Sequence, residues 1–118
     1  MHQILLVEDD VLIALSTSLT LEDGGYGVFH AENAQQAVDA LKVGSFAALV
    51  TDINLGPGED GFSVARRWRA LNPHKPVVFV SGDDAFRYAG EALQPSELIT
   101  KPFDPQQVLA FLNRRLLH

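Results

Sequence analysis

The stretch ILLVEDD at residues 4–10 places an unbroken apolar run directly before three acidic residues. An apolar run without polar alternation is typical of a parallel strand that is buried on both faces. Comparable runs recur at residues 47–50 and 77–80, and two further runs lie at 26–30 and 98–99. Segments with helical spacing separate these runs, so the sequence predicts an alternation of strands and helices.

Capping residues mark the ends of the predicted helices. Asn and Asp are favoured just before a helix, glycine commonly ends one, and proline is tolerated at its first position. Helices that connect parallel strands give a doubly wound α/β sheet, which binds ligands at the carboxyl ends of its strands. We expect one domain of this class over residues 1–118. The helices are predicted from Asp10 to Asp23 before Gly24-Gly25, from Asn33 to Gly44, from Gly61 to the Asn72-Pro73 stop, after Asp84 and before Pro95, and from Asp104-Pro105 onward.

The composition narrows the class of protein. The 118 residues are 47% hydrophobic and 20% charged, which is typical of a soluble globular domain. A net charge of −6 opposes direct binding to nucleic acid or to an anionic membrane, and the absence of cysteine excludes disulfides and thiolate metal sites. The uncharged stretch at 11–21 is shorter than the roughly 20 apolar residues of a membrane span. The start of the chain is too acidic for a signal peptide, so we expect a cytoplasmic protein.

Polar residues follow four of the predicted strands at the point where each apolar run ends. Because the carboxyl ends of parallel strands meet at one edge of a doubly wound sheet, we expect these side chains to converge. They are Glu8 and Asp9 after the first run, Asp52 after the third, Ser81 after the fourth and Lys101 after the fifth.

This set of three carboxylates, one hydroxyl and one ammonium has a chemical logic. Carboxylates that lie close together repel one another, and a divalent cation such as Mg²⁺, which prefers oxygen ligands, relieves that repulsion. A carboxylate can also act as a nucleophile and form an aspartyl phosphate. Phosphoryl transfer depends mainly on neutralising the charge of the phosphoryl oxygens, which a metal, a lysine and a hydroxyl can do.

Each of these residues alone has an ordinary structural interpretation. The neighbouring Asp10 suits an N-cap of the first helix, Asp52 a loop carboxylate, and Lys101 a solvated strand end. Ser81-Gly82 alone indicates only a turn. Four positions of the right chemical type, each at a strand end, favour a common site over these separate interpretations.

Four segments together resemble the receiver domain of two-component response regulators: LLVEDD at 5–10, VTDINL at 50–55, VSG at 80–82 and KPF at 101–103. The resemblance extends from residue 4 to about residue 117, and its motif set is specific. It implies a flavodoxin-like receiver fold with five helices and a five-stranded parallel sheet in the order 2-1-3-4-5. It also implies a signalling switch that catalyses its own phosphorylation and dephosphorylation.

The resemblance assigns roles to the clustered residues. Asp52 matches the phosphoacceptor, which takes a phosphoryl group from a sensor histidine kinase or a histidine phosphotransfer protein. Glu8 and Asp9 match the acidic pair that holds Mg²⁺, with Asp52 and the backbone carbonyl of Asn54 as the other protein ligands. Ser81 matches the hydroxyl that moves toward the phosphoryl oxygens.

At the end of the fifth strand, Lys101 matches the cation that pairs with the phosphoryl oxygens, and the peptide before Pro102 is expected to be cis.

Three features depart from the common receiver pattern. Leu98 stands where many receivers carry an aromatic switch residue, so the signal is expected to leave by another route. The loop at 56–61 is one residue longer than usual, and Ser81 replaces the commoner threonine.

Output is expected through contacts with a partner protein of unknown identity. A stand-alone regulator is favoured, and a receiver fragment of a longer regulator or hybrid kinase is the alternative. A vestigial receiver that acts as a constitutive binding module also stays open, because only phosphorylation chemistry separates it from an active one. A flavodoxin or a haloacid-dehalogenase-type phosphatase is disfavoured, because the first strand is followed by Glu8-Asp9-Asp10 instead of a phosphate loop or an Asp-x-Asp pattern.

The first predicted helix carries two apolar stripes, of which one can pack on the sheet while the other stays exposed. An exposed apolar stripe favours a partner surface or a homodimer through the first and last helices, and packing between these two helices is the alternative. The stripes are Leu12, Leu15 and Leu19 on one side and Ile13, Thr17 and Leu21 on the other, and Leu109 and Leu116 of the last helix are expected to extend the exposed one.

Overall fold

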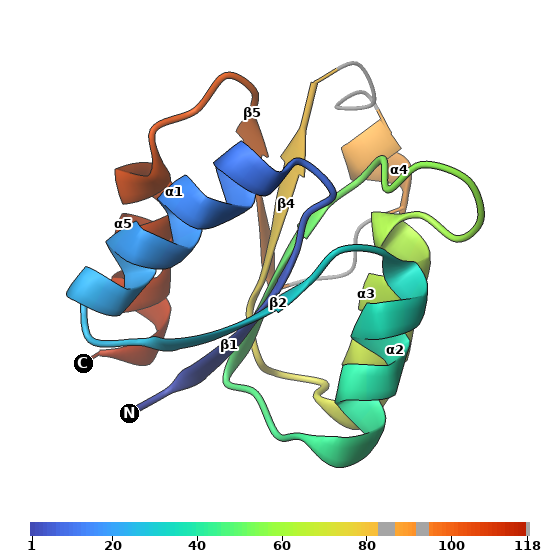
Figure 1. The fold of residues 1–118 in the computed structure, drawn as a ribbon. Helices are drawn as coiled ribbons and strands as arrows, with labels where there is room; N and C mark the ends of the chain where they lie inside the picture. Colours follow the sequence, from blue (N-terminus) through green and yellow to red (C-terminus); the bar gives the residue numbers. More distant parts are fainter. Residues whose placement is uncertain (83–86, 92–94, 118) are drawn as a thin grey trace.

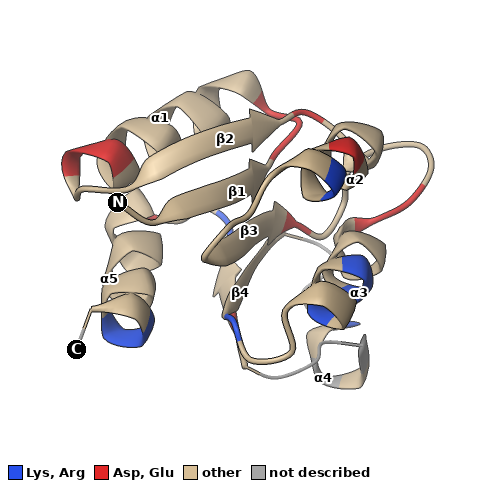
Figure 2. Cartoon of the chain, turned by 90° about the horizontal axis from the view of Figure 1, so that it is seen from below, with Lys and Arg blue, Asp and Glu red and all other residues tan. Residues whose placement is uncertain are grey.

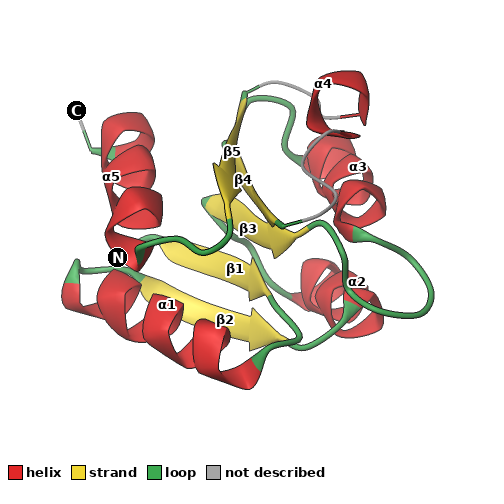
Figure 3. Cartoon of the chain, turned by 90° about the horizontal axis from the view of Figure 1, so that it is seen from above, coloured by secondary structure: helices red, strands yellow, loops and turns green. Residues whose placement is uncertain are grey.

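The computed structural model describes residues 1–82, 87–91 and 95–117. Five parallel strands form one sheet in the order β2-β1-β3-β4-β5. The helices α1 and α5 cover one face of this sheet, and α2, α3 and α4 cover the other (Figures 1 and 3). The strands are β1 (Gln3–Val7), β2 (Gly27–Ala31), β3 (Ala48–Asp52), β4 (Val77–Ser81) and β5 (Ser96–Thr100), and the helices are α1 (Val11–Asp23), α2 (Ala34–Val43), α3 (Gly61–Leu71), α4 (Tyr88–Glu91) and α5 (Pro105–Leu116).

The predicted fold class and strand order are confirmed, and the strand ends are corrected. The strands β3, β4 and β5 continue past their apolar runs, because each polar end residue pairs with a neighbouring strand: Asp52 lies opposite Val80, and Ser81 opposite Thr100. The strand β2 begins one residue later than predicted. The predicted start of the fourth helix after Asp84 lies outside the described residues, and within them α4 is a single turn.

Capping residues set the helix ends, as the sequence predicts. The carboxylate of Asp10 accepts hydrogen bonds from the backbone N–H groups at the start of α1, and Gly24 caps the other end. Gly25 follows with a φ of 98°, a conformation that favours glycine. Asn33 caps α2, and Asp104 caps α5 in a capping box with Gln107.

Two hydrophobic clusters fill the space between the sheet and its helices. Alternating side chains of the strands feed opposite clusters, because successive residues of a strand point to opposite faces. Leu5, Phe62, Trp68 and Phe79 belong to the cluster under α2 and α3. The cluster under α1 and α5 contains Ile4, Leu6, Ala14, Leu21, Tyr26, Val108, Phe111 and Leu112.

The helix α1 separates its two predicted stripes. Thr17 and Leu21 are buried, whereas 76%, 55% and 53% of Leu12, Leu15 and Leu19 are exposed. The expected extension of this exposed stripe by α5 is wrong, because Leu109 and Leu116 are half-buried against the core cluster. Within the described ranges, none of the helices is both long and apolar enough to cross a bilayer.

Candidate functional site

The carboxyl ends of β1, β3, β4 and β5 bring the predicted residues to one edge of the sheet. Acidic residues lie where β1 and β3 end, whereas the basic residues of α3 and α5 lie elsewhere (Figure 2). A cavity of about 320 Å³ opens at this edge. Its lining residues are Asp9, Asp52, Asn54, Gly56, Ser81, Gly82 and Lys101.

Lys101 joins the two acidic strand ends. Its Nζ donates a hydrogen bond to Asp52 Oδ2 at 2.7 Å and lies 3.4 Å from Glu8 Oε1. Burial alone would lower the pKa of Lys101, but the hydrogen bond and charge of Asp52, together with Glu8, raise it above its ordinary value. The Lys101 backbone N–H donates to the Ser81 carbonyl at 2.8 Å, and the Lys101–Pro102 peptide is cis, as predicted.

Asp52 lies at the end of β3 with only 6% of its surface exposed. One carboxylate oxygen, Oδ1, accepts a hydrogen bond from the Asn54 backbone N–H at 3.2 Å, and Oδ2 faces Lys101. Gly61, the first residue of α3, packs directly on the Asp52 backbone. A Cβ at this position would overlap the Asp52 carbonyl oxygen. The Asp52 backbone is therefore held by α3, and its carboxylate is held by Lys101 and the Asn54 backbone N–H.

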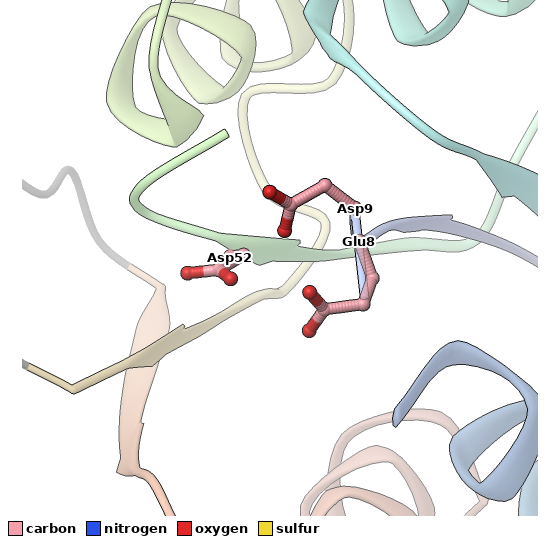
Figure 4. A group of neighbouring side chains, drawn as sticks. All are labelled: Glu8, Asp9 and Asp52. Atoms are coloured by element: carbon pink, nitrogen blue, oxygen red, sulfur yellow. The ribbon is translucent and has the colours of Figure 1, made fainter. Parts of the chain in front are cut away.

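Glu8, Asp9 and Asp52 form an acidic cluster in which one oxygen of each carboxylate lies within 4.8 Å of the others (Figure 4). Glu8 is 3% exposed, and burial raises its pKa to about 7. The charge of Asp52 contributes to this rise, and the Asp10 backbone N–H and Lys101 oppose it. Three carboxylates facing one lysine leave negative charge in excess, so the oxygen donors of this cluster fit a hard divalent cation.

Two further predicted residues lie at the cavity. Ser81 ends β4 and is 1% exposed, so its hydroxyl is held at the edge of the sheet beside Lys101. The Asn54 side chain accepts a hydrogen bond from the Gly56 backbone N–H at 3.0 Å, which shapes the loop after β3. The role of the Asn54 carbonyl as a metal ligand stays a prediction.

Sequence reasoning missed three residues that support the site. Gly61 permits the close approach of α3 to Asp52, and an Asp-Gly pair at the start of a helix was the available signal. The Arg87 guanidinium donates to Asp60 Oδ2 at 2.8 Å across 27 residues of sequence, a separation for which no local pattern exists. The Nε2 atom of His30 lies 2.7 Å from the Glu8 carbonyl oxygen, a contact between neighbouring strand ends that no local pattern displays.

A sequence model described as the response regulator receiver domain matches residues 4–113. The chain is 32% identical over 115 residues to the uncharacterized transcriptional regulatory protein YkoG of Bacillus subtilis, covering 96% of this chain and 50% of that protein. It is 32% identical over 112 residues to the virulence transcriptional regulatory protein PhoP of Salmonella typhimurium, covering 93% of this chain and 50% of that protein. The chain thus spans about half the length of the curated relatives that it matches.

Solved structures agree with this match. A response regulator receiver protein from Sinorhizobium medicae superposes with a TM-score of 0.93 at 31% identity, covering 98% of this chain and 94% of that one. The chemotaxis response regulator CheY4 of Vibrio cholerae superposes with a TM-score of 0.83 at 26% identity, covering 98% and 99% of the two chains.

Proposed function

The chain belongs to the response regulator receiver domain family, and we propose that Asp52 is its phosphoacceptor. The donor is a sensor histidine kinase or a histidine phosphotransfer protein. An Asp52 carboxylate oxygen attacks the phosphorus, a new O–P bond forms, and the N–P bond to the donor imidazole breaks. The arrangement that carries this proposal is the buried Asp52 carboxylate held 2.7 Å from Lys101 Nζ at the open edge of the sheet.

The neighbouring groups match what phosphoryl transfer requires. Lys101 supplies a positive charge for a phosphoryl oxygen, and Ser81 supplies a hydroxyl donor from the next strand end. Glu8, Asp9, Asp52 and the Asn54 carbonyl would hold Mg²⁺, which neutralises charge on the phosphoryl oxygens when bound. The proposal includes self-catalysed phosphorylation and dephosphorylation and keeps the cytoplasmic location expected from the sequence.

The test is the intact mass of the protein after incubation with acetyl phosphate, with and without Mg²⁺. We expect one phosphoryl adduct that requires Mg²⁺, that Asp52→Ala loses and that Asp39→Ala keeps, because Asp39 is an exposed carboxylate on α2. Beryllofluoride binding at Asp52 detects an acceptor whose phosphoryl group is too short-lived for mass analysis. Failure of both adduct and beryllofluoride binding would overturn the proposal and leave a vestigial receiver that binds partners constitutively.

The exposed stripe of α1 supports a second part of this proposal. We propose that Leu12, Leu15 and Leu19 contact a partner protein, and that a second copy of the chain is the partner to test first. Output then passes through protein contacts, in a stand-alone regulator or as the receiver part of a longer protein.

A further inference from the structure

A tyrosine of α4 and Leu98 of β5 pack against the same hydrophobic cluster. Leu98 precedes Lys101 by three positions and packs against the cluster under α2 and α3. Tyr88 packs against the same cluster from the first position of α4. Its hydroxyl lies 2.8 Å from Ser96 Oγ, so its side chain links α4 to the first residue of β5.

The Tyr88 ring contacts the strand that carries Ser81. Its centroid lies 5.9 Å from that of Phe79, with the two rings at 72° in an edge-to-face arrangement. Phe79 and Ser81 are two residues apart on β4, so their side chains leave the strand on the same face. The Tyr88 ring therefore packs against the residue that lies two positions before Ser81 on the same face of β4.

Arg87, the residue before Tyr88, contacts residues at the start of α3. The Arg87 guanidinium lies 5.1 Å from the centroid of Phe62 and pairs with Asp60 at 2.8 Å. The Phe62 centroid lies 4.9 Å from that of Phe79. Asp60 caps α3, whose first residue touches the Asp52 backbone, so the start of α4 is joined to both Asp52 and Ser81.

We propose that Tyr88 is the positioning residue that relays the state of the Asp52 site to the surface formed by α4 and β5. This inference rests on the proposed function. When the Ser81 hydroxyl is drawn toward a phosphoryl group, β4 shifts beneath the Phe79–Tyr88 contact, and a packed ring changes its position in a discrete step. The Tyr88–Ser96 hydrogen bond belongs to the unphosphorylated arrangement, and its loss or rearrangement changes how α4 sits on β5.

The chain contains two tyrosines, which gives the experiment an internal control. Tyr26 is also buried and donates its hydroxyl to Asn113 Oδ1 at 2.8 Å, but it lies in the cluster on the opposite face of the sheet. The protein is labelled with 3-fluorotyrosine, and its ¹⁹F NMR spectrum is recorded with and without Mg²⁺ and beryllofluoride. Tyr26→Phe assigns the two resonances, and the signal of bound beryllofluoride reports occupancy of Asp52.

We expect the Tyr88 resonance to shift when beryllofluoride is bound and the Tyr26 resonance to stay in place. In Ser81→Ala, samples with bound beryllofluoride should show no such shift. A stationary Tyr88 resonance in the occupied wild-type protein would overturn the relay while leaving the phosphoacceptor proposal intact. Absence of the bound beryllofluoride signal together with absence of the phosphoryl adduct would instead overturn the proposed function.

Backbone amide exchange gives a second readout that uses a conservative variant. Tyr88→Phe keeps the ring and removes the hydroxyl, and Tyr26→Phe is its match on the other face. We expect beryllofluoride to change exchange at residues 96–100 in the wild type and in Tyr26→Phe, and this response to be lost in Tyr88→Phe. An unchanged response in occupied Tyr88→Phe would contradict the role of the Tyr88–Ser96 bond.

Discussion

The face of the sheet covered by α1 and α5 and the face covered by α2, α3 and α4 each hold a tyrosine hydroxyl 2.8 Å from a side-chain oxygen. On the first face, Tyr26 precedes the edge strand β2 and binds Asn113 of α5. On the second, Tyr88 contacts Phe79, two residues before Ser81. The same kind of hydrogen bond therefore links α5 to the start of β2 on one face, and on the other it belongs to the tyrosine that we propose as the relay.

The residues of the site divide between these faces in the same way. Strand alternation places Asp52 on the side of Val50, which belongs to the cluster under α1 and α5. It places Ser81 on the side of Phe79, in the cluster under α2 and α3. The Asp52 carboxylate thus belongs to one face, whereas the Ser81 hydroxyl belongs to the other.

The largest expected loss of stability comes from a substitution that tests how closely a helix packs on the sheet. A Cβ at Gly61 would overlap the Asp52 backbone, so Gly61→Ala must displace α3 or the end of β3. We expect the free energy of unfolding to fall by about 3 kcal/mol or more, measured by urea denaturation.

The matched substitution on the other face is Gly24→Ala at the end of α1. Its Cβ would meet only the flexible tip of the Leu109 side chain, and its φ of −81° suits alanine. We expect a change below about 1 kcal/mol in either direction. Equal losses of unfolding free energy in Gly61→Ala and Gly24→Ala would show that the helices of the two faces do not differ in how closely they pack.

The next effect concerns the charge buried at the site. Because burial raises the pKa of Glu8 from 4.5 to about 7, the folded metal-free protein holds a proton that the unfolded chain releases. The contribution of Glu8 to stability is therefore full below about pH 4.5 and is lost as the pH rises to about 7. In EDTA we expect Glu8→Gln to gain up to about 3 kcal/mol over the wild type between these pH values.

Repeating the stability measurement with Mg²⁺ tests whether the Glu8 carboxylate also takes part in binding the cation. A cation that binds the folded acidic cluster stabilises the wild type at pH 7 and above, and Glu8→Gln should gain less from it. Parallel stability curves for the two proteins from pH 4.5 to pH 7 in EDTA would mean that the Glu8 carboxyl is already ionised in the folded state.

Local patterns account for what the sequence predicted correctly. Continuous apolar runs and capping residues such as Asp10 and Asn33 are set by neighbouring positions, so they predict the strands and the helix ends, whereas the strand order was implied by the resemblance to receiver domains. Residues directly after strands must gather at one edge of a parallel sheet, so Asp52, Ser81 and Lys101 could be assigned to one site.

Long-range packing accounts for what it missed. Asp52 and Ser81 belong to strands because of their partners on β4 and β5, which no local pattern displays. The contacts of Arg87 with Asp60 and of Tyr88 with Phe79 depend on how a one-turn helix meets elements distant in sequence. The half-burial of Leu109 likewise depends on how closely the end of α1 approaches α5.

A smaller effect tests whether the two tyrosine links are equal in stability. Tyr26→Phe and Tyr88→Phe each remove one hydroxyl and leave Asn113 or Ser96 with one hydrogen bond fewer. We expect each variant to lose about 1 kcal/mol in urea denaturation, because a typical side-chain hydrogen bond contributes about that much. A much larger loss in Tyr88→Phe would indicate that its hydroxyl supports the fold as well as the relay, and would narrow the contrast between the faces.

The smallest expected effect on stability comes from exposed leucines, one on each face. Leu15 of α1 is 55% exposed and Leu71 of α3 is 65% exposed, so Leu15→Asp and Leu71→Asp should each change the free energy of unfolding by less than about 1 kcal/mol. Association should separate them, because Leu15 lies in a stripe with Leu12 and Leu19. Sedimentation velocity is expected to show self-association of the wild type and of Leu71→Asp, and a monomer for Leu15→Asp. A monomeric wild type would exclude the second copy as the partner of α1 and leave that stripe to a different protein, since an aspartate at position 15 would then have no dimer to disrupt.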